Sequence, residues 1–151
     1  MPFRYRLQKI LDFRIRKKEE QLQVVHKAQE AVNRAQDDLD RNRKEIQTTK
    51  EGMRHADPMM FESYDKFLNH LWEKDEQLQA VLDEKKRQLE IEKQKLVKLE
   101  QAVKVLEKHK EHNKEAYIEE EKKAELKQYS ELGVVRFFRQ NQERKEINKE
   151  D

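Results

Sequence analysis

The 151-residue chain has 44% charged and 34% hydrophobic residues, whereas ordinary globular domains have about 25% and 45–50%. So few apolar side chains cannot fill a layered core, but they can fill the narrow seam between two paired helices. The 34 Lys and Arg nearly balance the 32 Asp and Glu, and the net charge of +2 argues against a dedicated nucleic-acid-binding protein. The absence of cysteine excludes disulfides and thiolate metal sites.

The basic N-terminal stretch MPFRYRLQKILDFRIRKK has no apolar core of the length that a signal peptide needs. No other segment approaches the ~20 apolar residues that span a bilayer. We therefore expect a protein of the cytosol or of the cytosolic face of a membrane.

The first helix is expected over residues 3–52. Large apolar residues recur in it every seven positions, at Val25, Val32, Leu39, Ile46 and Met53. The companion seam positions carry small or polar residues, namely Ala28, Ala35, Asn42 and Thr49. Large residues at one seam position and small ones at the other allow two helices to approach closely.

The stretch GMRHADPMMF at 52–61 separates two long runs without helix breakers. Gly52 suits the left-handed residue that ends a helix, and Asp57-Pro58 provides an N-cap followed by a first-turn proline. This pattern predicts a turn at residues 53–57 that reverses the chain.

The second helix is expected over residues 58–132. Its seam positions recur at the heptad spacing and are Phe61, Tyr64, Leu68, Leu71, Asp75, Leu78, Leu82, Lys85, Leu89, Glu92, Leu96, Leu99, Val103 and Leu106. Most of these are apolar over more than six heptads, which predicts a left-handed supercoil. Gly133 is expected to end the helix.

Residues 133–151 are expected to form an apolar cluster, Val134, Val135, Phe137 and Phe138, followed by a charged tail. The cluster could fold back on Phe3, Leu7 and Tyr117 or dock on a partner, and the sequence leaves open whether this region is ordered.

The predicted fold is thus all-α, with residues 1–132 forming a long antiparallel two-helix coiled-coil hairpin whose second helix is the longer. A reversal near residue 56 pairs residue i with roughly residue 112 − i. Glu92 then lies at the height of Lys18 and Gln21, so that polar gaps in the two helices face each other and fix the register.

Catalysis and metal binding are not expected. His109 and His112 share one helical face, but the sequence fixes no third ligand. There is no phosphate-binding glycine loop or nucleophile motif, and a two-helix rod has no concavity that could shelter a reaction. We expect no cofactor.

Two regions are candidates for binding partners. Basic residues interleaved with Phe3, Tyr5 and Phe13 are either a solvated face or a contact with an acidic protein or anionic lipid. Near the turn there are more large apolar residues than a seam can bury, which predicts either an exposed recognition patch or local packing and self-association. These residues are Met59, Met60, Phe61, Tyr64, Phe67, Leu68, Leu71 and Trp72.

Three local motifs resemble the FliJ proteins of the bacterial flagellar export apparatus. They are FRYRLQKILDFR at 3–14, YDKF followed by Leu71 at 64–71, and EEEKKAELKQYSEL at 119–132. The resemblance implies a non-enzymatic coiled-coil stalk similar to the rotor subunit of rotary ATPases. It also implies a cytoplasmic location, peripheral to the inner membrane at the flagellar base.

The resemblance further implies partners. The export ATPase would contact Phe3, Arg4, Leu7, Ile10 and Arg14. The membrane export gate would contact the tip at Tyr64, Phe67 and Leu71, beside Trp72. Other gate-binding positions of the family correspond to Asn42, Glu45, Thr49, Lys74 and Leu78, whose residue types match the family poorly. The family is also described as binding export chaperones, and no nucleic acid is implied.

Two alternatives remain open at this point. One is the stalk of a needle-type (type III) secretion system, which is similar in shape and role. The other is a homo-oligomeric coiled-coil tether without an ATPase partner.

Overall fold

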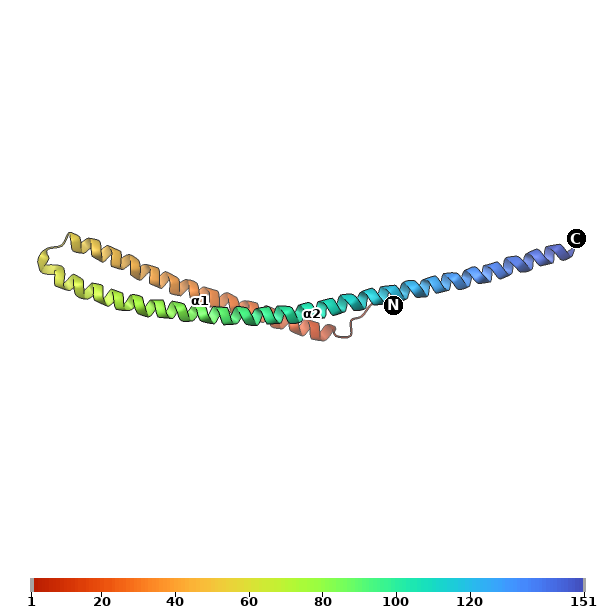
Figure 1. Cartoon of the computed structure of the whole chain (residues 1–151), viewed down its shortest axis with the longest axis horizontal. Coiled ribbons are helices and arrows are strands. Elements are labelled where there is room, and N and C mark those ends of the chain that lie inside the picture. The colour runs from red at the N-terminus through yellow and green to blue at the C-terminus, as the bar shows by residue number, and fades with distance from the viewer. Residues whose placement is uncertain (1, 151) are drawn as a thin grey trace. The chain divides into compact units, whose positions relative to one another are not determined.

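The computed structural model describes residues 2–150, which form two long helices joined by a short turn (Figure 1). Helix α1 spans Gln8–Arg54, the 3-10 helix η1 spans Pro58–Met60, and helix α2 spans Phe61–Glu150. No strand occurs among these residues. The predicted all-α class, with two helices of which the second is longer, is confirmed.

Contacts divide the chain into two units, which we describe separately. The hairpin unit comprises residues 12–103. The terminal unit comprises the N-terminal residues up to Leu11 and the residues from Lys104 onward.

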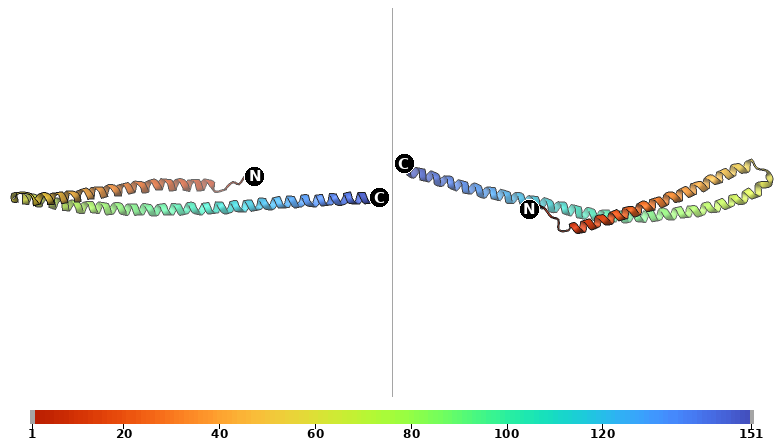
Figure 2. Two further views of the ribbon diagram at one scale, coloured as in Figure 1. Left: turned by 90° about the horizontal axis from the view of Figure 1, so that it is seen from above. Right: turned by 180° about the vertical axis from the view of Figure 1, so that it is seen from behind.

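In the hairpin unit, α1 and the first half of α2 lie side by side and run in opposite directions (Figure 2). Gln21 of α1 is hydrogen-bonded to Glu92 of α2, and Asn42 is hydrogen-bonded to the carbonyl of Leu71. The two residue numbers add to 113 in each pair, close to the predicted 112. The predicted register, with Gln21 facing Glu92, is therefore confirmed.

The seam of the hairpin is formed by the heptad positions that the sequence predicts. One apolar cluster contains Val32, Ala35 and Leu39 of α1 with Leu82 and Leu89 of α2. Another contains Ile46 of α1 with Leu68 and Leu71 of α2, and Met53 packs against it. Of the fourteen seam positions predicted on α2, only Phe61 is exposed. Because Leu39 and Leu82 are almost completely buried, removing either side chain would leave a cavity in the seam.

The turn between the helices occupies His55–Asp57. The Asp57 side chain accepts a hydrogen bond from the backbone N–H of Met59 at 3.1 Å, and Pro58 occupies the first helical turn. This arrangement confirms the predicted N-cap. Gly52, however, lies inside α1 with an ordinary negative φ, so its predicted left-handed conformation is wrong. Backbone hydrogen bonds from His55 to Gly52 and from Ala56 to Met53 end the helix instead.

Two helix ends differ from the predicted ones. Helix α1 begins at Gln8 rather than near Phe3, because Phe3 and Tyr5 pack their rings on α2 in a non-helical segment. Helix α2 continues through Gly133 to Glu150, where a helix end at 132 and a tail were predicted. A single glycine costs a helix only about 1 kcal/mol relative to alanine, and the residues that follow are mostly strong helix formers.

Candidate functional site

The N-terminal segment lies against α2 in the terminal unit. The ring of Phe3 lies 5.5 Å from that of Tyr117, centroid to centroid. The Tyr5 hydroxyl forms a hydrogen bond of 2.6 Å with Nδ1 of His109, and Tyr5 is buried. These two contacts hold residues 2–7 on one face of α2, so that two of the N-terminal aromatic side chains already have partners within the chain.

The predicted ATPase-contact residues differ in their accessibility. Arg4 and Ile10 are exposed, whereas Phe3 and Leu7 are half-buried. Arg14 belongs to the hairpin unit, where its Nη1 donates a hydrogen bond of 3.0 Å to the carbonyl of Ala102. Within the terminal unit, Arg4 and Ile10 are thus the members of this set that are fully available to a partner.

Large apolar side chains are exposed next to the turn. We call these side chains together the tip patch; they are Met59, Met60, Phe61, Phe67 and Trp72, which are 38–88% exposed. The Lys50 ammonium lies 5.9 Å from the centre of the Trp72 ring, within the range of a cation–π contact. Exposed Met and aromatic side chains at this density are typical of a surface that binds another protein.

Two residues predicted at the tip do not lie in this patch. The Leu71 side chain is only 2% exposed and packs with Ile46 and Leu68, so it is not available to a partner in this conformation. The Tyr64 ring is half-buried and lies across Gly52, where a Cβ atom would be 3.4 Å from the Tyr64 hydroxyl. The tip patch therefore retains Phe67 and Trp72 of the predicted set.

A shallow hollow opens on the hairpin surface beside Asn42. Its lining residues are Asp38, Arg41, Asn42, Glu45, Lys74 and Leu78. Asn42 is 2% exposed; its Nδ2 donates to the carbonyl of Leu71 at 2.9 Å, and its Oδ1 has no hydrogen-bond partner. A buried acceptor without a partner is destabilising. Four of the five additional positions that the resemblance assigned to gate binding line this one hollow, and Thr49 does not.

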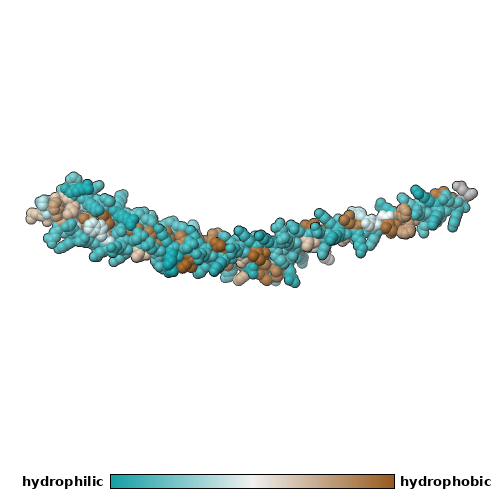
Figure 3. Space-filling model, in the orientation of Figure 1, coloured by the Kyte–Doolittle hydropathy of each residue, from teal (hydrophilic) through white to brown (hydrophobic). Residues whose placement is uncertain are grey.

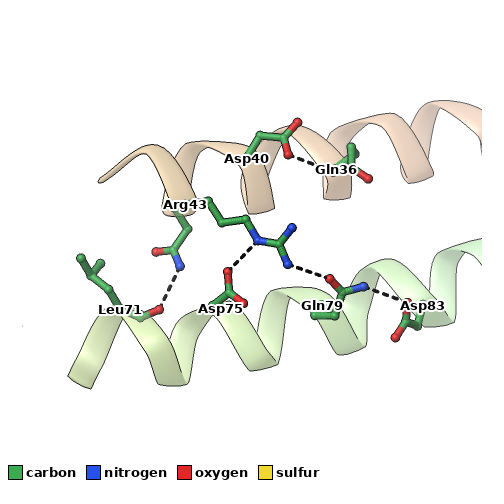
Figure 4. A network of polar contacts seen from close by, with 8 residues as sticks. Gln36, Asp40, Arg43, Leu71, Asp75, Gln79 and Asp83 are labelled. Carbon is green, nitrogen blue, oxygen red and sulfur yellow. Dashed lines mark hydrogen bonds and ion pairs between the residues drawn. The ribbon is translucent and has the colours of Figure 1, made fainter. Parts of the chain in front are cut away.

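Arg43, next to Asn42 in the sequence, connects the two helices on the surface. Its Nε donates to Asp75 at 3.0 Å and its Nη2 donates to Gln79 at 3.1 Å, while Gln79 donates to Asp83 (Figure 4). The Arg43 side chain is 52% exposed and the Asp75 side chain is 25% exposed, so solvent screens the pair and such a network contributes about 1 kcal/mol or less. It connects α1 to α2 at residues next to those that line the hollow.

A second polar layer joins Gln21 and Glu92. The Gln21 amide donates to the Glu92 carboxylate at 2.6 Å and to the Glu92 backbone carbonyl at 3.0 Å. The hydrogen bond from Gln21 favours the ionised carboxylate and lowers the pKa of Glu92, with a smaller contribution from Lys95. Elsewhere, the hydrogen bond from Tyr117 to Glu121 raises the pKa of the Tyr117 phenol.

The C-terminal part of α2 has no buried face. Every residue from 118 to 140 is exposed, including the predicted cluster of Val134, Val135, Phe137 and Phe138 at 49–63%. Figure 3 shows hydrophobic surface over this part of the helix. The cluster does not fold back on Phe3, which is paired with Tyr117.

The sequence interpretation missed further apolar residues of this segment. Leu126, Tyr129 and Leu132 are 55–70% exposed and follow one another at intervals of three residues within the charged stretch 119–132. That spacing places neighbouring members near one side of a helix, and it was the signal available in the sequence.

His109 and His112 share one face of α2, as the sequence indicated. Nδ1 of His109 is engaged by Tyr5, and no group of three or more potential ligands gathers anywhere between residues 2 and 150. Within the same residues, neither helix contains a stretch that is long and apolar enough to cross a bilayer.

Comparisons with known proteins identify the family. No curated protein and no solved structure matches the chain. The family model described as the flagellar FliJ protein matches residues 3–142, which include α1, the turn and α2 as far as residue 142. The chain therefore belongs to the flagellar FliJ protein family.

Proposed function

We propose that this protein is a non-enzymatic stalk that connects the export ATPase of the flagellar apparatus to its membrane export gate. Family membership implies a structural role in flagellar or type III protein export. The finer assignment rests on two sets of exposed side chains, one in each unit. It places the protein in the cytoplasm, at the membrane-proximal base of the flagellum, and export chaperones are further candidate partners.

The observation that carries the proposal is the apolar surface beside the turn. A two-helix hairpin needs only its seam residues for stability, and the seam clusters do not include Met59, Phe67 or Trp72. Exposing these side chains to water is unfavourable, and a binding partner would remove that cost. The hollow beside Asn42 adds exposed polar and charged side chains, among them Arg41, Glu45 and Lys74, to the surface near the turn.

For the ATPase we propose the N-terminal segment and the first turn of α1. Arg4 and Ile10 offer a positive charge and an apolar side chain close together in the sequence, and Phe3 and Leu7 are partly accessible. An acidic surface with an apolar centre is the kind of partner that such a set would recognise.

The test is binding to each purified partner separately. Ile10→Ala combined with Arg4→Ala should weaken binding to the export ATPase and reduce stimulation of its ATP hydrolysis, while leaving binding to the cytosolic domain of the gate unchanged. Phe67→Ala combined with Trp72→Ala should have the opposite effect. Truncation of a hot-spot side chain, a class enriched in Trp, Tyr and Arg, lowers affinity about thirtyfold or more.

Two controls separate binding from folding. Val97→Ala removes an exposed apolar side chain of α2 outside the tip patch and should leave both affinities unchanged. Tyr5→Phe removes the hydrogen bond to His109 but keeps the ring. If the unmodified protein binds neither the ATPase nor the gate domain, the stalk assignment is wrong.

A further inference from the structure

We propose that the C-terminal part of α2 pairs with the same segment of a second copy of this chain. The two segments would lie antiparallel, with a twofold axis at Val135, so that residue i of one copy faces residue 270 − i of the other. This association is a property of the free protein and is independent of the proposed stalk function.

The first reason is an unpartnered apolar strip that is symmetric about Val135. Leu132, Val135 and Phe138 are 49–63% exposed and lie three residues apart on one side of α2. In the antiparallel arrangement Val135 meets Val135 of the second copy, and Leu132 meets Phe138 of the second copy. Each apolar side chain of the strip therefore faces another apolar side chain.

The second reason is the shape of the same side of the helix. A shallow hollow there is lined by Gln128, Glu131, Leu132 and Val135. Phe138 of the second copy comes to the height of Leu132 and would enter this hollow. Because the arrangement is twofold, the other Phe138 enters the equivalent hollow of the second copy.

The third reason is charge. Residues 136–149 carry five Arg and Lys and two Glu, whereas residues 121–134, which face them in this register, carry three Glu and three Lys. A parallel arrangement would bring the two basic segments together. The antiparallel one sets the basic segment of each copy against a segment of the other that has no net charge.

The individual positions agree with this pairing. Opposite charges face each other at three pairs, and each pair occurs twice. The pairs are Glu125 with Lys145, Lys127 with Glu143, and Glu131 with Arg139. From residue 122 to residue 148, no two like charges face each other in this register. Flanking charge pairs of this kind determine partner choice and orientation in paired helices.

The test begins with the oligomeric state of the full chain. Analytical ultracentrifugation at ~10–200 μM should show a monomer–dimer equilibrium. Glu131→Arg or Arg139→Glu alone should raise the dissociation constant about tenfold, because each change makes two pairs repulsive. The double variant carrying both changes restores the pairing and should return the constant to within about threefold of the original.

Disulfide formation tests the geometry in a chain that has no native cysteine. Val135→Cys should give a covalent dimer under mild oxidation, because the two thiols meet at the axis. Phe137→Cys lies at nearly the same height on the opposite side of the helix and should cross-link at least ~10-fold more slowly.

Three results would each overturn the proposal: a monomer throughout the concentration range, failure of the double charge variant to restore association, or equal cross-linking of the two cysteine variants. None of them would affect the stalk function, which is measured by ATPase and gate binding. All the changes lie outside the hairpin unit, whose thermal unfolding serves as the control for folding.

Discussion

Two stretches of helix α2 have the same secondary structure but different surroundings. Residues 61–103 bury Leu68, Leu71, Leu82 and Leu89 against α1, whereas residues 118–140 bury no side chain at all. In the first stretch, packing fixes the position of the helix. In the second, only the helix propensity of its Glu, Lys, Gln and Leu residues favours the helical state, which for isolated helices is marginal. The comparison separates what makes a helix form from what holds it in place.

The prediction with the largest expected effect compares two leucine-to-alanine changes, one in the seam and one on the exposed stretch. Leu39→Ala in the seam should lower the free energy of unfolding by about 2–4 kcal/mol, because Leu39 is 1% exposed and packs with Leu82. Leu132→Ala, on the exposed stretch, should change it by less than about 0.5 kcal/mol. Urea unfolding of both variants measures the difference. Equal effects at a concentration where the chain is monomeric would mean that the exposed stretch is packed within the single chain.

The next test concerns the polar interruption of the seam. Asn42→Leu removes the unpaired Oδ1 and should stabilise the hairpin by about 1–2 kcal/mol. It should also loosen the register, because the bond to the Leu71 carbonyl is lost. Asn33→Leu, at an exposed position of α1, serves as the control and should do neither. A destabilised Asn42→Leu variant would contradict this expectation.

Replacing each glycine by alanine distinguishes the packed hairpin from the exposed stretch more finely. Gly52→Ala should stabilise the hairpin by about 0.5–1 kcal/mol, because Gly52 is helical and the added Cβ would reach Tyr64 at an ordinary contact distance. Gly133→Ala meets no neighbouring atom. It should increase the helical circular dichroism signal while leaving the unfolding midpoint of the hairpin unchanged.

The smallest expected effect is a pH dependence. The hydrogen bond from Gln21 lowers the pKa of Glu92 below its ordinary value of 4.5 in the folded state. The contribution to stability is therefore fully present above pH 4.5 and is lost as the pH falls through the lowered folded-state value. Thermal unfolding between about pH 2 and pH 7 should show a shallower acid destabilisation for Glu92→Gln than for the unmodified protein. Identical profiles would place the carboxylate in solvent.

The features that the sequence predicted well depend on short-range chemistry. The heptad spacing of Val32, Leu39 and Ile46 identified the seam, because a helix has a fixed period. Asp57-Pro58 identified the start of the second helical region, because both residues have strong positional preferences at that point. The height of Gln21 relative to Glu92 followed from the position of the turn and the fixed rise per residue.

The features that were predicted wrongly depend on neighbours that are distant in sequence or on small energy differences. Phe3 and Tyr5 leave the helix because their rings contact Tyr117 and His109, more than 100 residues away. Gly52 and Gly133 were read as helix ends, but a glycine within strongly helical flanks remains helical. For the candidate site, the heptad pattern already placed Leu71 in the seam, yet the motif resemblance assigned it to a contact surface together with Phe67.

Three of the hairpin's inter-helix hydrogen bonds share a property that bears on how the sequence can change over evolution. Arg14, Gln21 and Asn42 on α1 each donate to a backbone carbonyl of α2, at Ala102, Glu92 and Leu71. A substitution can delete a donor side chain, but every amino acid supplies the carbonyl. The two helices therefore differ in their tolerance to substitution. Substitutions at the three acceptor positions on α2 preserve these hydrogen bonds to the backbone, whereas substitutions at the three donor positions on α1 abolish them. In an alignment of homologous chains, we expect the three donor positions on α1 to vary less than the three acceptor positions on α2.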